Sequence, residues 1–266
     1  MADVFGQGEY AVRFDWGPNG ALTTRADLAV VVDVLSFSTT VTVAVERGMR
    51  VFPYRWQGPG AAEFAARNDA ALAVGRLEAL RGDAVMSPTL SPAGLLHGPA
   101  YPRLVLASPN GATIAQALDD GATTVTIGCL RNAQAVALWL APLVSSGRSV
   151  AVVAAGERWD ADDSLRPAIE DLLGAGAVLA ALMTLVGGDG FSPEASLAAE
   201  ASTAGRERLA TRLHDCASGR ELAAKGFGAD VDVAADLNSS SVVPVLVAGA
   251  FDDAESAQKR ATKGSQ

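Results

Sequence analysis

Short apolar runs alternate with segments of helical period along most of the chain. Continuous apolar runs predict buried strands, and apolar residues that recur every three or four positions predict helices. The predicted strands cover residues 28–34, 50–56, 103–107, 123–127, 149–154 and 242–248. The predicted helices cover residues 39–47, 59–69, 112–119 and 132–145 between strands, and residues 167–186, 193–203, 205–216 and 219–225 after them.

This order predicts an α/β fold, with a mostly parallel sheet between two layers of helices. A helix-rich C-terminal portion follows and returns a strand at residues 242–248 to the sheet. We expect one domain over residues 1–253, with two lobes that meet near residues 155–166 as an alternative, and a flexible polar tail over residues 254–266. Proline, glycine and serine interrupt the alternation between residues 76 and 102, which predicts an irregular surface loop there.

Composition narrows the class of protein. Hydrophobic residues make up 49% of the chain and aromatic residues only 6%, so the core must consist mainly of alanine, valine and leucine. The formal net charge of −9 disfavours nucleic acids and anionic membranes as partners. No apolar run approaches the roughly 20 residues that cross a bilayer, and Cys129 and Cys216 are too few for a disulfide framework. We therefore expect a cytoplasmic protein with a small ligand.

The first long apolar run, which begins at Leu28, ends in a carboxylate and leads into several hydroxyl side chains. A buried strand that delivers such groups to the start of a helix has the composition of an α/β active site. Asp33 is the catalytic candidate, and the substrate-binding candidates beside it are Ser36, Ser38, Thr39 and Thr40. The alternative is that Asp33 caps the next helix and that the hydroxyls bond to the backbone.

A second polar turn follows the strand at residues 103–107. Ser108, Asn110 and Gly111 open a helix whose free amides form an anion site, and we expect Gly111 to turn the backbone with a positive φ and to let it approach a ligand. An ordinary turn is the alternative, because Asn-Gly is a common turn dipeptide.

A third polar turn follows the strand at residues 123–127. We expect Arg131 to clamp a phosphate or carboxylate and Asn132 to cap the helix at the same crevice. Cys129 precedes them and is interpreted as a buried thiol rather than a nucleophile.

Carboxylates follow the strand at residues 149–154. Glu157 lies just beyond its end and is the second catalytic candidate. Farther along, Glu170 and Asp171 precede small residues that let a helix pack closely on its neighbours. Adjacent helical residues point about 100° apart, so only one of the pair faces a shared metal easily. We choose Asp171.

These four turns are expected to meet at one edge of the sheet, where doubly wound folds bind ligands. Their side chains are carboxylates, hydroxyls, amides and arginine, with almost no histidine. This set disfavours zinc hydrolysis and suits Mg²⁺ with an oxyanion. The predicted metal ligands are Asp33 and Asp171.

The ordered set of these segments resembles the 2-phosphosulfolactate phosphatase family, from about residue 27 to about residue 250. The matching segments are Val30–Leu35 with Thr39-Thr40, Ser108–Gly111, Gly128–Asn132, Ala155-Gly156, Glu170-Asp171 with residues 174–177, and Asp232-Val233 with Val243-Pro244. Each segment is short, but six in the same order are fairly specific.

The resemblance implies a Mg²⁺-dependent phosphatase that removes phosphate from 2-phosphosulfolactate or a related 2-hydroxy-acid phosphate, a step in coenzyme M biosynthesis. The implied partner is a small anionic phosphate ester, and a homodimer is compatible with this reading. In this family context Asp33 serves as metal ligand or as nucleophile, and the two roles stay open.

Two positions depart from the family pattern. Ser36 stands where the pattern has an arginine, and Gly75-Arg76 lacks the glutamate of a Gly-Glu-Arg element. One lost charge-assisted contact costs on the order of 1.5 to 3 kcal/mol, which motivates an alternative function: a non-catalytic member that binds a small anion as a sensor or interaction module. A dinucleotide-binding oxidoreductase is disfavoured, because no Gly-x-Gly-x-x-Gly follows the first predicted strand.

Overall fold

The computed structural model describes residues 4–55, 59–76 and 88–263, and it confirms the α/β class. Within these ranges, one nine-stranded sheet has the order β1-β7-β2-β6-β10-β11-β3-β5-β4. Its strands are β1 (Val12–Trp16), β2 (Leu28–Val32), β3 (Arg50–Tyr54), β4 (Ala71–Leu72), β5 (Arg103–Ala107), β6 (Thr124–Gly128), β7 (Val150–Ala154), β10 (Pro244–Val247) and β11 (Ala250–Asp253). A separate hairpin joins β8 (Glu157–Arg158) to β9 (Leu165–Arg166).

The sheet is mostly parallel, as predicted. Strands β1, β7, β2 and β6 pair in parallel, and so do β3, β5 and β4. The antiparallel hairpin β10–β11 lies between these two parallel parts and pairs with β6 on one side and β3 on the other. Strand β10 is the predicted returning strand, and the chain adds β11 after it to complete the connection.

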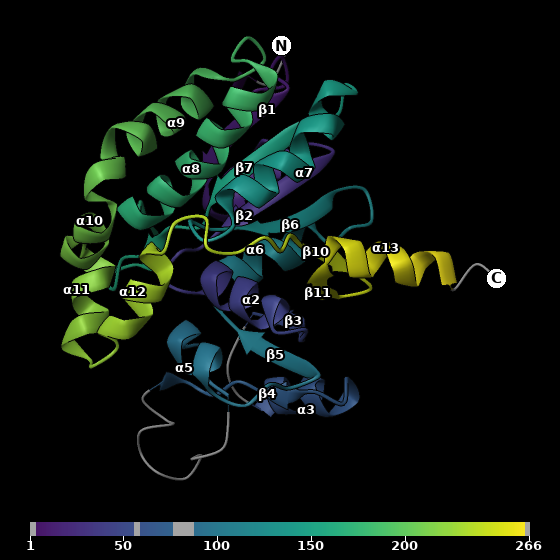
Figure 1. Ribbon diagram of the computed structural model, residues 1–266, viewed down its shortest axis with the longest axis vertical. Helices are drawn as coiled ribbons and strands as arrows, with labels where there is room; N and C mark the ends of the chain where they lie inside the picture. Colours follow the sequence, from purple (N-terminus) through teal and green to yellow (C-terminus); the bar gives the residue numbers. More distant parts are fainter. Residues whose placement is uncertain (1–3, 56–58, 77–87, 264–266) are drawn as a thin grey trace.

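Helices cover both faces of the sheet (Figure 1). Alternate residues of β2 face opposite ways: Leu28, Val30 and Val32 join the core beneath one helical layer, whereas Ala29 and Val31 join the core beneath the other. The first layer contains α7 (Ala133–Ser145), α8 (Ile169–Val186), α9 (Pro193–Gly205) and α10 (Leu209–Asp215), and the second contains α1 (Gly17–Thr23), α2 (Phe37–Glu46), α5 (Pro92–His97) and α6 (Gly111–Leu118). The remaining helices are α3 (Pro59–Arg67), α11 (Ala217–Ala224), α12 (Gly228–Ala235) and α13 (Ala254–Lys263).

Helix α8 packs tightly because glycines replace side chains on two of its faces. A Cβ atom at Gly174 would lie 2.5 Å from Val34 Cγ2, and one at Gly176 would lie 2.1 Å from the carbonyl oxygen of Ala198 on α9. The close packing predicted from these small residues is therefore present. By length and composition α8 is apolar enough to cross a membrane, but it packs between α7 and α9 as the core helix of a soluble protein does.

Three parts of the fold differ from the sequence prediction. The loop at residues 76–102 contains α5, because Ser91 Oγ accepts a hydrogen bond from the amide of Gly94 and Pro92 starts the helix. The tail predicted to be flexible forms α13, and Arg260 on this helix pairs with Asp252. Strand β1 and helices α1 and α12 were not predicted. Residues 56 and 77–87, parts of a predicted strand and of the predicted loop, lie outside the described residues.

Candidate active site

Asp33 follows β2, and its carboxylate connects the amino-terminal ends of two helices. Oδ1 accepts a hydrogen bond from the amide of Phe37 on α2 at 3.2 Å. Oδ2 accepts one from the amide of Gly111 on α6 at 2.9 Å and one from Ser108 Oγ at 3.5 Å. Burial raises the pKa of Asp33 and the charge of Glu170 raises it further, whereas these hydrogen bonds lower it. The carboxylate therefore does more than cap α2: it also holds α6 in place.

Gly111 is required for a different reason from the one predicted. Its φ is not among the positive values of the described glycines. Instead, a Cβ atom at Gly111 would lie 2.8 Å from Asp33 Oδ2 and 2.5 Å from Phe37 Cδ1. Glycine is therefore needed for the close approach of α6 to the carboxylate.

The predicted hydroxyl residues after Asp33 are buried and bond to the backbone. Ser38 Oγ accepts from the amide of Asp33 at 2.8 Å and donates to the carbonyl of Val31 at 3.1 Å. Thr39 Oγ1 donates to the carbonyl of Val34, and Thr40 Oγ1 donates to the carbonyls of Ser36 and Leu90. In this structure, Ser38, Thr39 and Thr40 stabilise the turn that presents Asp33.

Glu157 lies at the end of the same group of loops. One of its oxygens accepts a hydrogen bond from Asn110 Nδ2 at 3.1 Å, so the loops after β5 and β7 meet here. Both residues line a cavity of about 330 Å³ together with Trp16 and Leu165. Burial, followed by the charges of Asp33 and Glu170, raises the pKa of Glu157 to about 7. Such a carboxyl group exchanges protons near neutral pH, as a general acid or base must.

Asp171, on the first turn of α8, holds the turns after β2 and β7 together. Its Oδ1 accepts from the amide of Val34 at 2.7 Å, and its Oδ2 accepts from the amide of Gly156 at 2.8 Å. Burial and the charges of Asp33 and Glu170 raise the pKa of Asp171 well above its usual value. Glu170, its neighbour in the sequence, was not chosen as a metal ligand. It is also buried, and its charge raises the pKa of Asp33 as well.

Arg131 and Asn132 make their contacts within the loop after β6 and with the C-terminal segment. Arg131 Nη1 lies 3.3 Å from an Asp236 carboxylate oxygen and donates to the carbonyl of Val233. The Asn132 side chain accepts from the amide of Cys129 and donates to two backbone carbonyls. These bonds join the sheet to the segment that precedes β10, and none of them involves Asp33, Asn110, Glu157 or Asp171.

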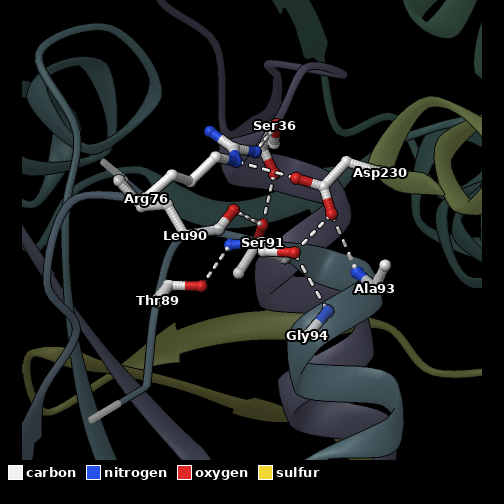
Figure 2. Close-up of polar contacts among 9 residues, drawn as sticks. Ser36, Arg76, Thr89, Leu90, Ser91, Ala93, Gly94 and Asp230 are labelled. Carbon is white, nitrogen blue, oxygen red and sulfur yellow. Dashed lines mark hydrogen bonds and ion pairs between the residues drawn. The ribbon is translucent and has the colours of Figure 1, made fainter. Parts of the chain in front are cut away.

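Ser36 lies against a cation (Figure 2). The guanidinium of Arg76 donates to Ser36 Oγ and forms an ion pair with Asp230 on α12, with a distance of 2.7 Å from Nε to Oδ2. The other oxygen of Asp230 accepts from Ser91 Oγ and from the amide of Ala93. The sequence singles out Arg76 only as part of a motif. It gives no sign of the contact with Asp230, because 154 positions separate the two residues.

The donor set is compatible with Mg²⁺. In the described part of the chain, no three acidic, histidine or cysteine side chains form a complete metal cage. Mg²⁺ does not need one, since it usually takes one or two carboxylates together with waters and substrate phosphates. Burial is the largest cause that raises the pKa values of Asp33 and Asp171. The charge of Glu170 also raises the pKa of Asp33, and the charges of Asp33 and Glu170 also raise that of Asp171. A divalent cation would offset this excess of negative charge.

Together, the fold and the site define an α/β protein whose buried carboxylates lie in loops that follow parallel strands, where folds of this class bind ligands. Comparison with known proteins agrees. The sequence model of 2-phosphosulpholactate phosphatase matches residues 19–249. A protein of Deinococcus radiodurans named "Probable 2-phosphosulfolactate phosphatase" is 29% identical over 238 residues, which cover 84% of this chain and 89% of the relative. The chain belongs to the 2-phosphosulfolactate phosphatase family, and its enzyme class is that of the phosphoric monoester hydrolases.

Proposed function

We propose that this chain is a cytoplasmic, Mg²⁺-dependent phosphatase. It hydrolyses 2-phosphosulfolactate, or a related 2-hydroxy-acid phosphate, to the hydroxy acid and inorganic phosphate, a step in coenzyme M biosynthesis. Family membership and the name of the Deinococcus relative support the substrate class. The observation that carries the mechanism is the position of the Asp33 carboxylate between the amino-terminal ends of α2 and α6, with Glu157 joined to the same loop through Asn110.

In the proposed reaction, the amino-terminal ends of α2 and α6 attract the phosphoryl oxygens, because the helix dipole favours an anion there. The amides of Phe37 and Gly111 already bond to Asp33, so the phosphoryl group lies beside this carboxylate rather than on those two amides. Asp33 supplies the carboxylate nearest to these amides. It acts as nucleophile or as metal ligand. Borohydride trapping of an acyl phosphate on Asp33 distinguishes the two roles, since only a nucleophilic carboxylate forms that intermediate.

Glu157 is the proposed proton carrier. With a pKa of about 7 it holds a proton at neutral pH for part of the time. As the phosphorus–oxygen ester bond breaks, this proton moves to the leaving oxygen and yields the hydroxy acid. Water then supplies the hydroxyl group that ends on phosphorus, and the proton released by water returns to Glu157.

Asp33 and Asp171 are the proposed ligands of Mg²⁺. When bound, the metal neutralises phosphate charge as the reaction proceeds. The carboxylates, with their raised pKa values, are the groups whose charge such a cation would stabilise.

Phosphate release from a panel of 2-hydroxy-acid phosphates, assayed with Mg²⁺, tests this proposal. We expect turnover in the wild type, loss of turnover in Asp33→Asn, and wild-type turnover in Asp119→Asn, which makes the same change at an exposed position. Absence of turnover on every ester, under conditions where a Deinococcus-type relative is active, would contradict the proposal.

The alternative is a non-catalytic anion sensor. It is motivated by Ser36, where the family pattern has an arginine, and by Gly75-Arg76, which lacks the glutamate of the pattern. The guanidinium of Arg76 lies against Ser36 and places a cation there. Ligand-induced thermal stabilisation without turnover would nevertheless favour the sensor.

A further inference from the structure

We infer that Arg76 binds the second anionic group of the substrate, at the end away from the phosphate, and that Asp230 positions Arg76 for this task. The inference rests on the proposed function, because it assigns a specificity-determining residue to the same site. The second group is a carboxylate or a sulfonate, and both present negatively charged oxygen atoms. The experiment below distinguishes the two.

The location of Arg76 supports this role. Its guanidinium donates to Ser36 Oγ, and the amide of the next residue, Phe37, donates to Asp33 Oδ1. The cation and the Asp33 carboxylate are therefore attached to consecutive residues at the start of α2. Under this inference, a substrate whose phosphate lies beside Asp33 extends its other end toward Arg76.

The guanidinium is held in one orientation. Nε pairs with Asp230, Nη2 bonds to Ser36, and the Arg76 guanidinium carbon lies 5.6 Å from the centre of the Phe227 ring. Asp230 is only 1% exposed and also accepts from two groups at the start of α5, so it is itself fixed. An arginine held in this way loses little conformational entropy when it binds a ligand.

Arg76 also keeps a face for a ligand. Its side chain is 16% exposed, and Figure 2 shows the third guanidinium nitrogen pointing away from both Ser36 and Asp230. Within the described ranges, this nitrogen has no hydrogen-bond acceptor. A guanidinium edge with free donors matches a carboxylate or sulfonate in geometry and charge.

Arg131, the arginine that the sequence favoured for this task, already faces two carboxylates of its own chain. It is 5% exposed, its guanidinium faces Asp236 and Glu46 and donates to the carbonyl of Val233, and its Nε has no hydrogen-bond partner within the described residues. An acidic protein that binds a substrate with several negative charges needs a cation beside the site. Of these two arginines, Arg76 is the one positioned to provide it.

The test compares three phosphate esters: p-nitrophenyl phosphate, with no second anion; phosphoglycolate, with a carboxylate; and the phosphate ester of 2-hydroxyethanesulfonate, with a sulfonate. The variant is Arg76→Gln combined with Asp230→Asn, because removal of Arg76 alone would leave Asp230 buried without its cation. Arg67→Gln, at an exposed position of α3, is the matched control.

We expect the double variant to raise KM, and to lower kcat/KM at least tenfold for one or both anionic esters relative to p-nitrophenyl phosphate. The ester that is affected identifies the group that Arg76 binds. An unchanged ratio for both esters would overturn the inference and leave Arg76 a purely structural role. If thermal melting shows that the double variant is unfolded, Arg76→Lys, which keeps the charge and removes the planar fork, must show the same loss of discrimination.

A binding measurement separates this inference from the proposed function. The three esters do not include 2-phosphosulfolactate itself, so their failure to react would leave the phosphatase proposal to its own panel; calorimetric titration with 3-sulfolactate then tests Arg76 directly. A dissociation constant at least tenfold weaker in the double variant supports the inference. An equal constant, or no binding to the wild type, overturns it.

Discussion

Replacement of Glu157 by glutamine separates the two consequences of its raised pKa. The substitution removes the charge and keeps an oxygen that accepts from Asn110 Nδ2, so the contact between the loops after β5 and β7 is retained. In the wild type, burial is the largest cause of the shift from 4.5 to about 7, and the charges of Asp33 and Glu170 add to it. Glutamine experiences none of this penalty.

The magnitude follows from the two pKa values. A shift from 4.5 to about 7, at about 1.4 kcal/mol per unit, amounts to about 3 kcal/mol of native-state destabilisation when Glu157 is ionised. The folded pKa is raised, so the folded state holds the proton more tightly. This loss of stability is absent below pH 4.5, grows as pH rises from 4.5 to about 7, and is complete above pH 7. Glu157→Gln should therefore become more stable than the wild type as pH rises, by up to about 3 kcal/mol.

Urea unfolding in EDTA at several pH values between 4.5 and 8 measures this difference. Glu63→Gln, the same change at an exposed position of α3, should show no pH-dependent difference from the wild type. In an Asp33→Asn background the effect should shrink, because one of the charges that raises the pKa of Glu157 is gone. A stability difference that stays constant across this range would refute the reasoning.

The same substitution tests the role of Glu157 in the reaction. Loss of a general acid lowers kcat by about 10² to 10⁴-fold. The wild-type rate should fall as pH rises above about 7, where Glu157 loses its proton, and this high-pH decline should be absent in Glu157→Gln. A decline that persists in the variant would assign the titration to another group.

Three further predictions follow from the packing and the donor set. Gly111→Ala places a Cβ atom 2.8 Å from Asp33 Oδ2. We expect kcat to fall at least about tenfold and the free energy of unfolding to fall by about 1–3 kcal/mol. The control is Gly228→Ala, which should change kcat little because nothing lies within 4 Å of the new Cβ atom. Gly176→Ala forces α8 away from Ala198, and urea unfolding should show a similar loss of stability. Removal of Mg²⁺ with EDTA should abolish phosphate release and added Mg²⁺ should restore it; full activity in EDTA would refute the metal requirement.

Elements with a strong local signal were predicted well. Strand β5 has the predicted bounds because its apolar run is bordered by proline on one side and Ser-Pro on the other. Strand β1 was missed because the strands were predicted from continuous apolar runs. Its sequence, VRFDW, instead alternates apolar and charged residues, as a strand at the sheet edge with one buried face does. Helix α12 was missed because GADVDVAA lacks a clear apolar stripe.

In the candidate site, too, contacts between neighbouring loops could be predicted and contacts between distant segments could not. The proximity of Asp33, Asn110 and Glu157 could be predicted, because each lies in the loop after a strand of the parallel sheet; their roles stay predictions. The role of Gly111 was misjudged, since a close approach by a distant carboxylate leaves no local trace. The pairing of Arg76 with Asp230 depends on the packing of α12 against α5, and no spacing in the sequence indicates that contact.

Because Arg76 and Asp230 lie far apart in the sequence, the ribosome synthesises them at different times. Residues near the N-terminus leave the ribosome first, so β2, Asp33 and Arg76 exist in a nascent chain well before Asp230 is synthesised. Until α12 has packed, Arg76 lacks the carboxylate that orients it. A chain truncated before residue 230 would carry Asp33 and Arg76 without the Asp230 carboxylate, so it would lack the proposed ability to discriminate substrates until Asp230 has been synthesised and α12 has packed.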